Sequence, residues 1–432
     1  MANNPFVSVI NLGCRVNRVE SDRITADLAR AGFMLVEPDD ADLIVINTCA
    51  VTGEAEAKTR KAVRHALGRA REPYVLATGC SVNLHPEMLH ELSGRVITEP
   101  SKVDVVPRVC EALGYTLEEP DADAPTRDLS ELLGRARLGV KIQDGCNNRC
   151  TYCIVWKARG AERSVPVDSV LAQVREAADA GIPEIVLTGV NLGAYDGADE
   201  TDAHVEIDEL LQRILDETDI EHVRISSIEP MDLSERLIHV MAANPTRVAP
   251  FLHLPIQSGC TETLRRMNRS YTAEEFEETI ANVRAILPNV SLSCDLIVGF
   301  PGETEQEFED SYELCRRVGF SRMHVFRYSA RPGTPAAVMD DQIDPKVMAQ
   351  RSAMVRQLAD AMARTDATTR LGSTETAVLE YGRFATLGSY HRAVVDDAPE
   401  GLKPQKLQVV LNSVDDKGLV HVTLAPGCSF NE

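Results

Sequence analysis

The chain has 432 residues, of which 44% are apolar and 26% charged, values typical of a globular protein with two or three domains. No apolar run approaches the roughly 18 residues that a membrane-spanning helix needs, and residues 1–5 lack the basic and apolar regions of a secretory signal. The formal net charge of −21 excludes a surface that binds nucleic acids generally, because phosphate binding needs clustered cations. We therefore expect a cytoplasmic protein that contacts no membrane and that can bind RNA only through local basic patches.

Residues 1–117 alternate short apolar runs with helical segments, which predicts an open parallel α/β sheet flanked by helices. The predicted strands are 6–10, 43–46 and 74–77, and the predicted helices are 21–31 and 55–71. The second helix holds no acidic residue from Ala57 to Arg71. Its lysines and arginines form either an RNA-binding patch or a solvated helix face.

Three cysteines of this first domain, Cys14, Cys49 and Cys80, each follow a predicted strand by three or four residues. Ligand sites of open α/β sheets lie at the carboxyl ends of the strands. We therefore expect the three thiols to converge at one edge of the sheet. Buried structural thiols could occupy the same positions, since free cysteine is commonly buried.

Residues 118–132 begin with an acidic, proline-bearing stretch without apolar periodicity and are predicted to be a linker. Strand–helix alternation resumes in residues 133–368, with predicted strands 139–142, 184–187, 222–225, 251–254, 292–298 and 323–326. Six such units fit a (β/α)6 partial barrel, although the pattern leaves a full eight-stranded barrel or a doubly wound sheet open. Two helix starts are predicted from capping-box spacing, at Thr272 with Glu275 and at Thr304 with Glu307.

The last domain, residues 369–432, consists of short β-prone runs separated by turns. The predicted strands are 375–379, 393–395, 407–411 and 419–424, and a helix over 347–365 connects them to the preceding domain. This pattern is typical of a small antiparallel β-barrel.

A second group of cysteines, Cys146, Cys150 and Cys153, lies directly after the first strand of the predicted partial barrel. Three thiolates do not complete a structural zinc site, which needs four protein ligands. They can hold three irons of a cubane iron–sulfur cluster and leave the fourth iron open to a small chelating substrate. Active sites of α/β barrels form at the carboxyl ends of the strands, so the position supports a cluster. Compact polar or glycine-rich segments follow four further strands, at 187–191, 226–230, 253–259 and 295–303.

Together these features resemble the radical S-adenosylmethionine (SAM) methylthiotransferase family over essentially the whole chain. The resemblance rests on the two cysteine trios, on Arg159-Gly160 followed by Glu162-Arg163-Ser164, and on the strand-end segments. It implies an N-terminal methylthiotransferase domain, a radical SAM partial barrel and a C-terminal TRAM-like β-barrel. One departure is the single tryptophan, Trp156, in a loop where the family usually has a proline. Its side chain either packs or adds a stacking surface.

The resemblance also implies cofactors and their ligands. Cys146, Cys150 and Cys153 correspond to the ligands of the SAM-cleaving [4Fe–4S] cluster, and Cys14, Cys49 and Cys80 to those of an auxiliary [4Fe–4S] cluster. Candidates for the SAM pocket or its support are Tyr152, Thr188, Gly189, Asn191, Ser227, Glu229, Gln257, Ser258 and Asp295. The implied reaction uses two SAM molecules per turnover, because one generates a radical and the other supplies a methyl group.

The segments Asn11 to Asn17 and Asn47 to Thr52 look most like the branch that acts on N6-threonylcarbamoyladenosine at position 37 of tRNA. This branch implies the tRNA anticodon stem-loop and a low-potential electron donor, such as flavodoxin or ferredoxin, as partners. Isopentenyladenosine 37 of tRNA and an aspartate of ribosomal protein S12 remain alternatives. The S12 alternative is kept open by residues 372–432, which hold five Lys or Arg against eight Asp or Glu. RNA contacts would then use the basic helix together with Arg159, Arg163, Arg265, Arg266 and Arg269.

An alternative of another class is a non-catalytic RNA-binding protein stabilised by metal sites. The two incomplete cysteine trios count against it, since neither has a fourth ligand. A cobalamin-dependent radical SAM enzyme would also begin with an α/β domain. The first domain lacks the D-x-H-x-x-G signature of such enzymes, so this alternative is set aside.

Overall fold

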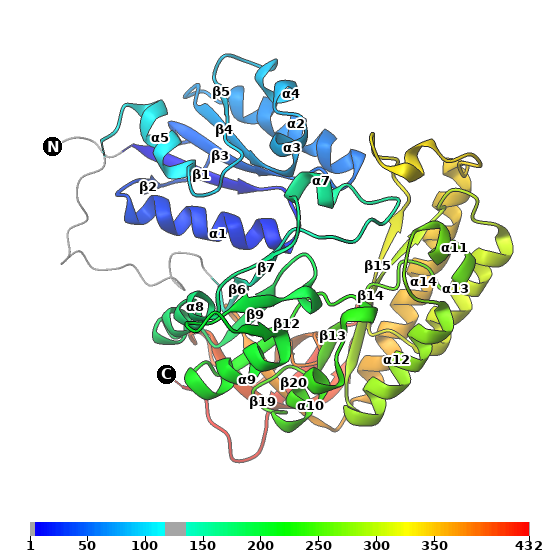
Figure 1. Cartoon of the computed structure of the whole chain (residues 1–432). Coiled ribbons are helices and arrows are strands. Elements are labelled where there is room, and N and C mark those ends of the chain that lie inside the picture. Colours follow the sequence, from blue (N-terminus) through cyan, green and yellow to red (C-terminus); the bar gives the residue numbers. More distant parts are fainter. Residues whose placement is uncertain (1–4, 117–134, 432) are drawn as a thin grey trace.

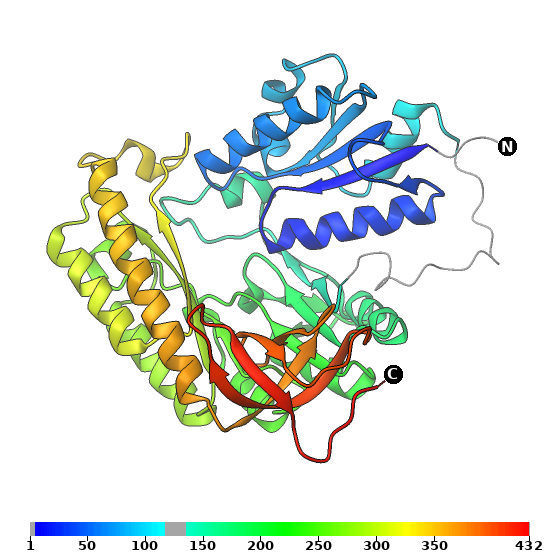
Figure 2. The same ribbon diagram turned by 180° about the vertical axis from the view of Figure 1, so that it is seen from behind.

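The computed structural model describes residues 5–116 and 135–431, so the predicted linker at 118–132 lies outside the described residues. The described chain forms an N-terminal α/β region, a central half-open barrel and a small C-terminal β-barrel (Figure 1). The reverse view shows the C-terminal barrel against the central region (Figure 2). The barrel also contacts the N-terminal region, because Arg15 donates to the Tyr390 hydroxyl at 3.0 Å.

The N-terminal region is a five-stranded parallel sheet with the strand order β2-β1-β3-β4-β5. Its elements are β1 (Phe6–Asn11), α1 (Arg15–Arg30), β2 (Met34–Leu35), β3 (Leu43–Thr48), α2 (Gly53–Leu67), β4 (Tyr74–Gly79), α3 (Cys80–Leu84), α4 (Glu87–His90), β5 (Val96–Thr98) and α5 (Val105–Leu113). The central strand β3 is buried on both faces, because Leu43 and Val45 belong to one apolar core and Ile44 and Ile46 to the other. The predicted parallel sheet is therefore confirmed.

Helix α1 begins six residues before its predicted start at position 21. The first turns bury mainly polar side chains, among them Asn17, Glu20 and Ser21, with Val16 as the one buried apolar side chain before Ile24. Apolar periodicity therefore could not reveal this part of the helix. This buried polar face of α1 contacts charged side chains of the central region, because Glu20 pairs with Lys141 and Arg159.

The central region contains six parallel strands in two three-stranded sheets, β6-β9-β12 and β13-β14-β15. Isolated parallel bridges from Val223 to Val248 and from Ser227 to His253 join the two sheets, which gives the predicted partial barrel. The strands are β6 (Arg137–Lys141), β9 (Glu184–Thr188), β12 (His222–Ile225), β13 (Phe251–His253), β14 (Ser291–Val298) and β15 (Arg322–Arg327), and two-stranded ribbons pair β7 (Gln143–Asp144) with β8 (Arg163–Ser164) and β10 (Asp196–Ala198) with β11 (His204–Glu206).

Helices between these strands cover the outside of the partial barrel (Figure 1). They are α8 (Val167–Asp179), α9 (Ile207–Glu217), α10 (Glu235–Ala243), α11 (Thr261–Arg266), α12 (Ala273–Ile286) and α13 (Glu305–Val318), joined by α14 (Pro345–Thr369) after the last strand. The short helix α7 (Val155–Arg159) lies against the N-terminal region instead, and 3-10 turns occur at η1 (Leu192–Ala194), η2 (Pro230–Asp232) and η3 (Pro335–Val338). Both predicted capping boxes are present, at the first turns of α12 and α13. None of the described helices combines the length and apolarity that crossing a membrane requires.

The C-terminal strands close into a five-stranded barrel with the order β16-β17-β18-β20-β19. The strands are β16 (Thr374–Leu379), β17 (Phe384–Leu387), β18 (Arg392–Val395), β19 (Gln405–Val414) and β20 (Val420–Leu424). Strand β17 was not predicted, because its four residues lie close to the turns on either side. The closed barrel confirms the predicted small β-barrel, although β18 and β20 pair in parallel and the barrel is therefore not purely antiparallel as expected.

The small barrel contacts the core at the amino ends of the core strands. Arg224 in β12 is fully buried and donates to the carbonyl oxygens of Leu387 and Gly388, at 3.0 and 2.9 Å. The Tyr390 ring lies 4.7 Å from that of Phe251 at the start of β13. The opposite ends of the core strands, where barrel enzymes carry out chemistry, face the N-terminal region.

Candidate active site

The first cysteine trio lies at the carboxyl ends of three adjacent strands. Cys14 follows β1 and precedes α1, Cys49 follows β3 directly, and Cys80 begins α3 directly after β4. The registers place Asn11 beside Asn47 and Thr48 beside Gly79, so the three strands end at the same edge of the sheet. The predicted convergence of these cysteines at one sheet edge is confirmed.

Local backbone and polar contacts hold this trio in place. Gly79, directly before Cys80, has a φ of +99°, and a Cβ there would lie 2.6 Å from the carbonyl oxygen of Thr48. Buried Asn17 donates to the same carbonyl oxygen at 2.7 Å, and the Cys14 thiol lies 3.6 Å from the Asn17 side-chain oxygen. Burial raises the pKa of the Cys80 thiol to about 11. Cys49 and Cys80 are thus buried and Cys14 is exposed, and the raised pKa keeps the Cys80 thiol protonated at neutral pH unless a metal binds it.

The second trio lies in the loop that follows β6 and β7. Gly145 has a φ of +73°, and a Cβ there would overlap the carbonyl group of Ala161, so only glycine fits this turn. Buried Gln143 donates to the Gly145 carbonyl oxygen at 3.0 Å and accepts from the Asn191 amide at 3.0 Å. The cysteine loop is thus tied to the segment that follows β9.

Hydrogen-bond donors face the sulfur atoms of the second trio. The Arg269 guanidinium lies 3.3 Å from the Cys150 sulfur, and the Val155 amide lies 3.4 Å from the Cys153 sulfur. Burial raises the pKa of Cys146 to about 11 and that of Cys153 to about 12, so these thiols are protonated at neutral pH unless a metal binds them. Donors aimed at sulfur suit the negative charge of metal-bound thiolates.

The two trios fit cubane clusters better than single metal ions. Among residues 5–116 and 135–431, no three His, Cys, Asp or Glu side chains are grouped closely enough to hold one metal ion. Each cysteine of a three-ligand cubane binds a different iron, so the sulfur atoms stand farther apart than the ligands of one ion. Thiol chemistry, the donors to sulfur and the ligand number of three all agree with this kind of site.

The predicted SAM-pocket residues lie in three places: beside the cysteine loop, around β14, and in the turns that follow the strands. Tyr152 and Glu229 lie beside the cysteine loop, where Glu229 forms an ion pair with buried Arg269. Asp295 in β14 lies 3.4 Å from His253, and its carbonyl oxygen accepts from the backbone amide of Gln257 at 2.9 Å. The remaining predicted residues mainly support turns, through hydrogen bonds or close packing, and are Thr188, Gly189, Asn191, Ser227 and Ser258.

The two cysteine loops are connected by a direct contact between helices. Cys80 begins α3 and Cys153 lies two residues before α7, and α3 packs on α7 in a small apolar cluster that includes Ala50, Cys80 and Ala158. Asn83 on α3 donates to the Ala158 carbonyl oxygen on α7 at 2.8 Å. The two cysteine loops, which are far apart in the sequence, therefore lie close together in the structure.

Arg159, at the end of α7, extends this connection through buried charges. Its guanidinium lies 2.9 Å from Glu20, 2.9 Å from Asp144 and 2.6 Å from the Asn17 side-chain oxygen. Burial alone would raise the pKa of Glu20, but Arg159 and Lys141 lower it to about 2. The network therefore joins α1 to the cysteine loop of the core through fully ionised groups.

Two arginines expected to contact RNA have other roles. The side chains of Arg159 and Arg269 are only 7% and 1% exposed, and both are paired with acidic residues inside the protein. The expectation of RNA contacts there is wrong, because the charge that suggested them neutralises buried carboxylates. Arg269 instead positions the second cysteine trio through its contact with the Cys150 sulfur. Gln143 also positions this trio but was not predicted, since its only signal in the sequence is its place directly before the cysteine loop.

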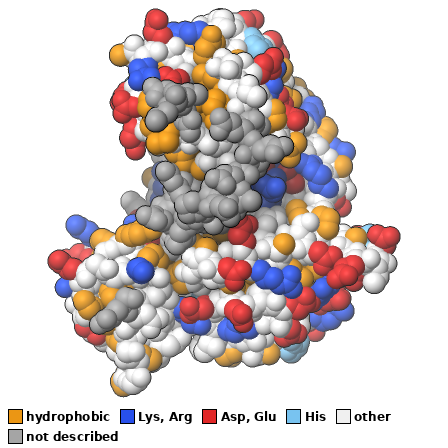
Figure 3. Space-filling model, turned by 90° about the vertical axis from the view of Figure 1, so that its left-hand side faces the viewer, with side chains coloured by type: hydrophobic (Ala, Val, Ile, Leu, Met, Phe, Trp, Pro, Cys, Tyr) orange, Lys and Arg blue, Asp and Glu red, His pale blue; other side chains and the backbone are white. Residues whose placement is uncertain are grey.

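The basic helix is also less cationic than its sequence indicates. Lys58 pairs with Glu54 at 2.8 Å, and Arg69 and Arg71 pair with Asp39 and Asp42 from the loop before β3. Acidic and basic side chains are interspersed on the described part of the face shown in Figure 3. Trp156 is half-buried beneath Arg149, whose guanidinium carbon lies 4.3 Å from the ring centroid, so it forms a cation–π contact at the surface.

Comparison with protein families agrees with this division of the chain. Residues 140–315 match the radical SAM superfamily, and residues 7–98 match the Uncharacterized protein family UPF0004. The first match covers the second cysteine trio, and the other covers the first trio. Members of the radical SAM superfamily use a [4Fe–4S] cluster and SAM, which are therefore the cofactors of this protein.

Curated relatives align over most of the chain. The threonylcarbamoyladenosine tRNA methylthiotransferase MtaB of Bacillus subtilis is 35% identical, over 83% of this chain and 81% of its own length. The protein of the same name from Chlamydia pneumoniae is 32% identical, over 95% of this chain and 96% of its own length. The tRNA-2-methylthio-N(6)-dimethylallyladenosine synthase of Magnetococcus marinus is 34% identical, over 85% of this chain and 86% of its own length.

A solved structure shares the fold at much lower identity. The radical SAM methyltransferase TsrM from Kitasatospora setae has a TM-score of 0.56 and 15% identity, and the match covers 78% of this chain and 75% of that chain. It supports the arrangement of the α/β domain and the partial barrel, but nothing about the reaction. Extensive identity to the curated relatives decides the family. The chain belongs to the radical SAM methylthiotransferases.

Proposed function

We propose that the protein adds a methylthio group to C2 of N6-threonylcarbamoyladenosine at position 37 of tRNA. The observation that carries this proposal is the contact of α3 with α7, which brings the loops of two separate cysteine trios together. One open-sited cluster serves SAM cleavage, and a second one beside it provides a place for the sulfur that is inserted. The names of the relatives from Bacillus subtilis and Chlamydia pneumoniae favour the threonylcarbamoyl substrate.

We assign each cysteine trio to one of the two clusters. Cys146, Cys150 and Cys153 would hold the SAM-cleaving cluster, and the auxiliary cluster would be held by Cys14, Cys49 and Cys80. The cofactors supply one-electron cleavage of SAM and a second SAM as methyl source, a chemistry that acid–base side chains cannot perform on an unactivated C–H bond.

The tasks of the protein side chains are orientation and exclusion of water. Arg269 orients the cysteine loop through the Cys150 sulfur and through Glu229. Asp295 and Gln257, which come from the other half of the barrel, are assigned to binding SAM. The N-terminal sheet lies over the open ends of the core strands, which would limit access of water to a radical intermediate.

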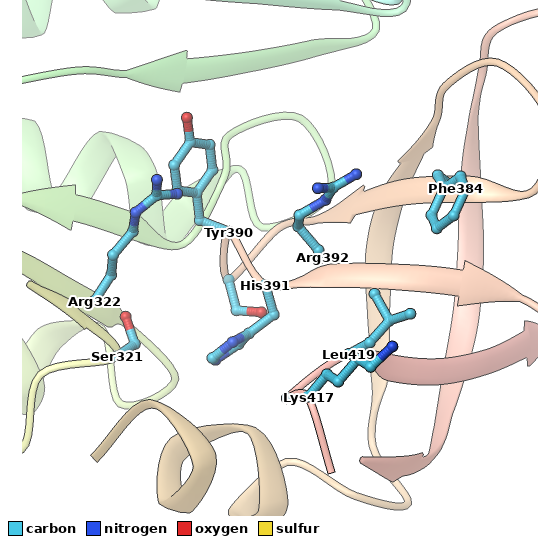
Figure 4. A pocket seen from close by; sticks show the side chains of 10 residues that line it. Ser321, Arg322, Phe384, Tyr390, His391, Arg392, Lys417 and Leu419 are labelled. Carbon is cyan, nitrogen blue, oxygen red and sulfur yellow. The ribbon is translucent and has the colours of Figure 1, made fainter. Parts of the chain in front are cut away.

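A cationic pocket suits docking of the RNA backbone. A cavity of about 450 Å3 lies between the core and the small barrel, and none of the described residues that line it is acidic. Figure 4 shows Arg322, His391, Arg392 and Lys417 around this space, with the Phe384 ring at its side. Phe384 is 46% exposed and can stack on a base. This local concentration of positive charge would offset the acidic net charge of the chain.

The proposed partners are the anticodon stem-loop of tRNA and a low-potential electron donor such as flavodoxin or ferredoxin. A tRNA substrate would also place the reaction in the cytoplasm. The relative from Magnetococcus marinus favours a second substrate, the dimethylallyl (isopentenyl) adenosine of tRNA. The two nucleosides differ only in the substituent on N6, so one experiment can separate them.

The test is nucleoside mass spectrometry of tRNA from a deletion strain, with and without the restored gene. We expect 2-methylthio-N6-threonylcarbamoyladenosine to disappear on deletion and to return with the wild-type gene, but not with Cys150→Ala. If the 2-methylthio-N6-isopentenyl nucleoside disappears instead, the substrate is N6-isopentenyladenosine and the proposed substrate is wrong. If both nucleosides persist and ribosomal protein S12 loses a methylthio group, a tRNA substrate is excluded.

A further inference from the structure

A second cavity lies at the open edge of the partial barrel, between the two parts of the protein that carry the cysteine trios. Its volume is about 380 Å3. The N-terminal side contributes Leu12, two residues before Cys14, and Thr52, three residues after Cys49. The core side is formed by the carboxyl end of the edge strand β15 and by α14. A nucleoside placed here would be next to the first trio and at the catalytic end of the core strands.

The cavity has an apolar part and a cationic part. Val325, Phe326, Tyr328 and Met348 contribute apolar side chains, and Phe326 is 44% exposed. Such a surface suits the flat face of a purine, because bases stack on aromatic rings regardless of their sequence.

The cationic part includes two arginines whose side chains form no ion pair with a described acidic residue. Among the described residues, the Arg327 side chain makes no hydrogen bond or ion pair, although its charge adds to that of Lys58 in lowering the pKa of Glu54. The only side-chain hydrogen bond of Arg356 to a described residue is a 3.5 Å bond to the Val325 carbonyl oxygen. The single carboxylate of the lining, Glu54, is already paired with Lys58 at 2.8 Å. Two guanidinium groups are therefore available to an anionic ligand.

We infer that Arg327 and Arg356 bind the carboxylate of the threonylcarbamoyl group and so select the substrate nucleoside. This inference rests on the proposed function. Guanidinium groups match carboxylates in geometry and form strong charge-assisted hydrogen bonds with them. An isopentenyl group is a hydrocarbon that offers no acceptor, so its entry would desolvate both arginines without compensation. The cavity thus discriminates between two substituents on the same adenine.

The experiment measures equilibrium binding of anticodon stem-loop RNAs to the reconstituted protein. Nucleoside 37 is N6-threonylcarbamoyladenosine, its neutral carboxamide or N6-isopentenyladenosine. We expect the wild type to bind the carboxylate RNA about tenfold or more tightly than the carboxamide RNA. Arg327→Ala and Arg356→Ala should each lower this preference severalfold, and Arg327→Lys should retain part of it. Arg316→Ala, which changes an exposed arginine on α13, is the matched control and should keep the full preference.

The outcomes separate this inference from the proposed function. If the wild type methylthiolates the carboxylate RNA while both alanine variants keep the full preference for it over the carboxamide, the inference is overturned and the proposed function stands. If the wild type methylthiolates only the isopentenyl RNA, the proposed substrate and the inference both fail. Thermal unfolding of each variant is measured alongside. The inference is supported if the double variant, which carries both alanine substitutions, unfolds like the wild type but no longer prefers the carboxylate RNA.

Discussion

The Arg159 guanidinium lies 2.9 Å from the Glu20 carboxylate, although the two residues belong to different domains. Both side chains are almost completely buried, at 7% and 5% exposure. Removing one partner of a buried pair leaves an uncompensated charge, which costs about 3–5 kcal/mol. The pair therefore holds the N-terminal sheet against the core at the point where the cysteine loops meet.

We expect Arg159→Met to lower the stability of the cluster-free protein by up to about 3–5 kcal/mol, because Glu20 and Asp144 lose their most buried partner. Lys141, which also pairs with both carboxylates, keeps the loss below the cost of two fully unpaired charges. Thermal unfolding and urea titration measure the change. Arg163→Met is the control, since Arg163 also pairs with Asp144 but its side chain is 59% exposed, so its loss should cost less than about 1 kcal/mol. Equal effects of the two substitutions would show that the Arg159 network does not hold the domains together.

Iron analysis separates the two cysteine trios. After anaerobic reconstitution the wild type should hold about eight irons, and Cys80→Ala and Cys150→Ala about four each. Cys80→Ala should still cleave SAM to methionine, whereas Cys150→Ala should not. Cys428→Ala, which changes an exposed cysteine outside both trios, should behave as wild type. SAM cleavage by Cys150→Ala would contradict the ligand assignment.

The ion pair of Glu184 with Arg224 predicts an acid-sensitive contact between the core and the small barrel. Burial alone would raise the pKa of Glu184, but Arg224 and His222 outweigh it and hold that pKa well below its usual range. A depressed folded-state pKa stabilises the protein above the unfolded-state value of about 4.3, and this stabilisation is lost progressively as the pH falls below it. Arg224, which then loses its partner, also binds the Leu387 and Gly388 carbonyl oxygens.

We therefore expect Glu184→Gln to lower stability at neutral pH by about 3–5 kcal/mol and to flatten the further loss below a pH of about 4.3. Thermal unfolding of the cluster-free protein from pH of about 7 to about 3.5 measures both effects. The matched control is Glu221→Gln, at a carboxylate that is 54% exposed and 3.7 Å from Lys406. If the stability of Glu184→Gln falls with pH as steeply as that of the wild type, the acid sensitivity comes from other groups.

The cationic pocket between the core and the small barrel should contribute to tRNA affinity. Arg392→Ala and Lys417→Ala remove positive charge from its lining. If each residue contacts a phosphate, each substitution should weaken tRNA binding and reduce the slope of log K against log salt by about 1. Lys346→Ala, at an exposed lysine on α14 outside this pocket, serves as control. Unchanged salt slopes in both variants would place the RNA elsewhere.

Much of the fold was readable from local pattern. The core strand β12 (His222–Ile225) has its predicted bounds, and the other core strands differ from prediction by at most two residues at either end. Short buried runs between helices leave few alternatives to a parallel strand. The start of α1 and the strand β17 were missed, because a buried polar helix face and a four-residue strand carry no apolar period. The choice of a partial barrel over a full barrel depended on how strands pair, which the pattern left open.

The sequence by itself determined which residues of the protein are candidates to bind metal clusters. Two spaced cysteine trios predict two ligand sets, since spacing and residue type are properties of the chain alone. Only the tertiary structure decided what surrounds them. Arg159 and Arg269 read as surface charges in the sequence, but folding buries both beside carboxylates and cysteine loops. Burial and long-range pairing arise from contacts between residues more than a hundred positions apart, and no local pattern encodes them.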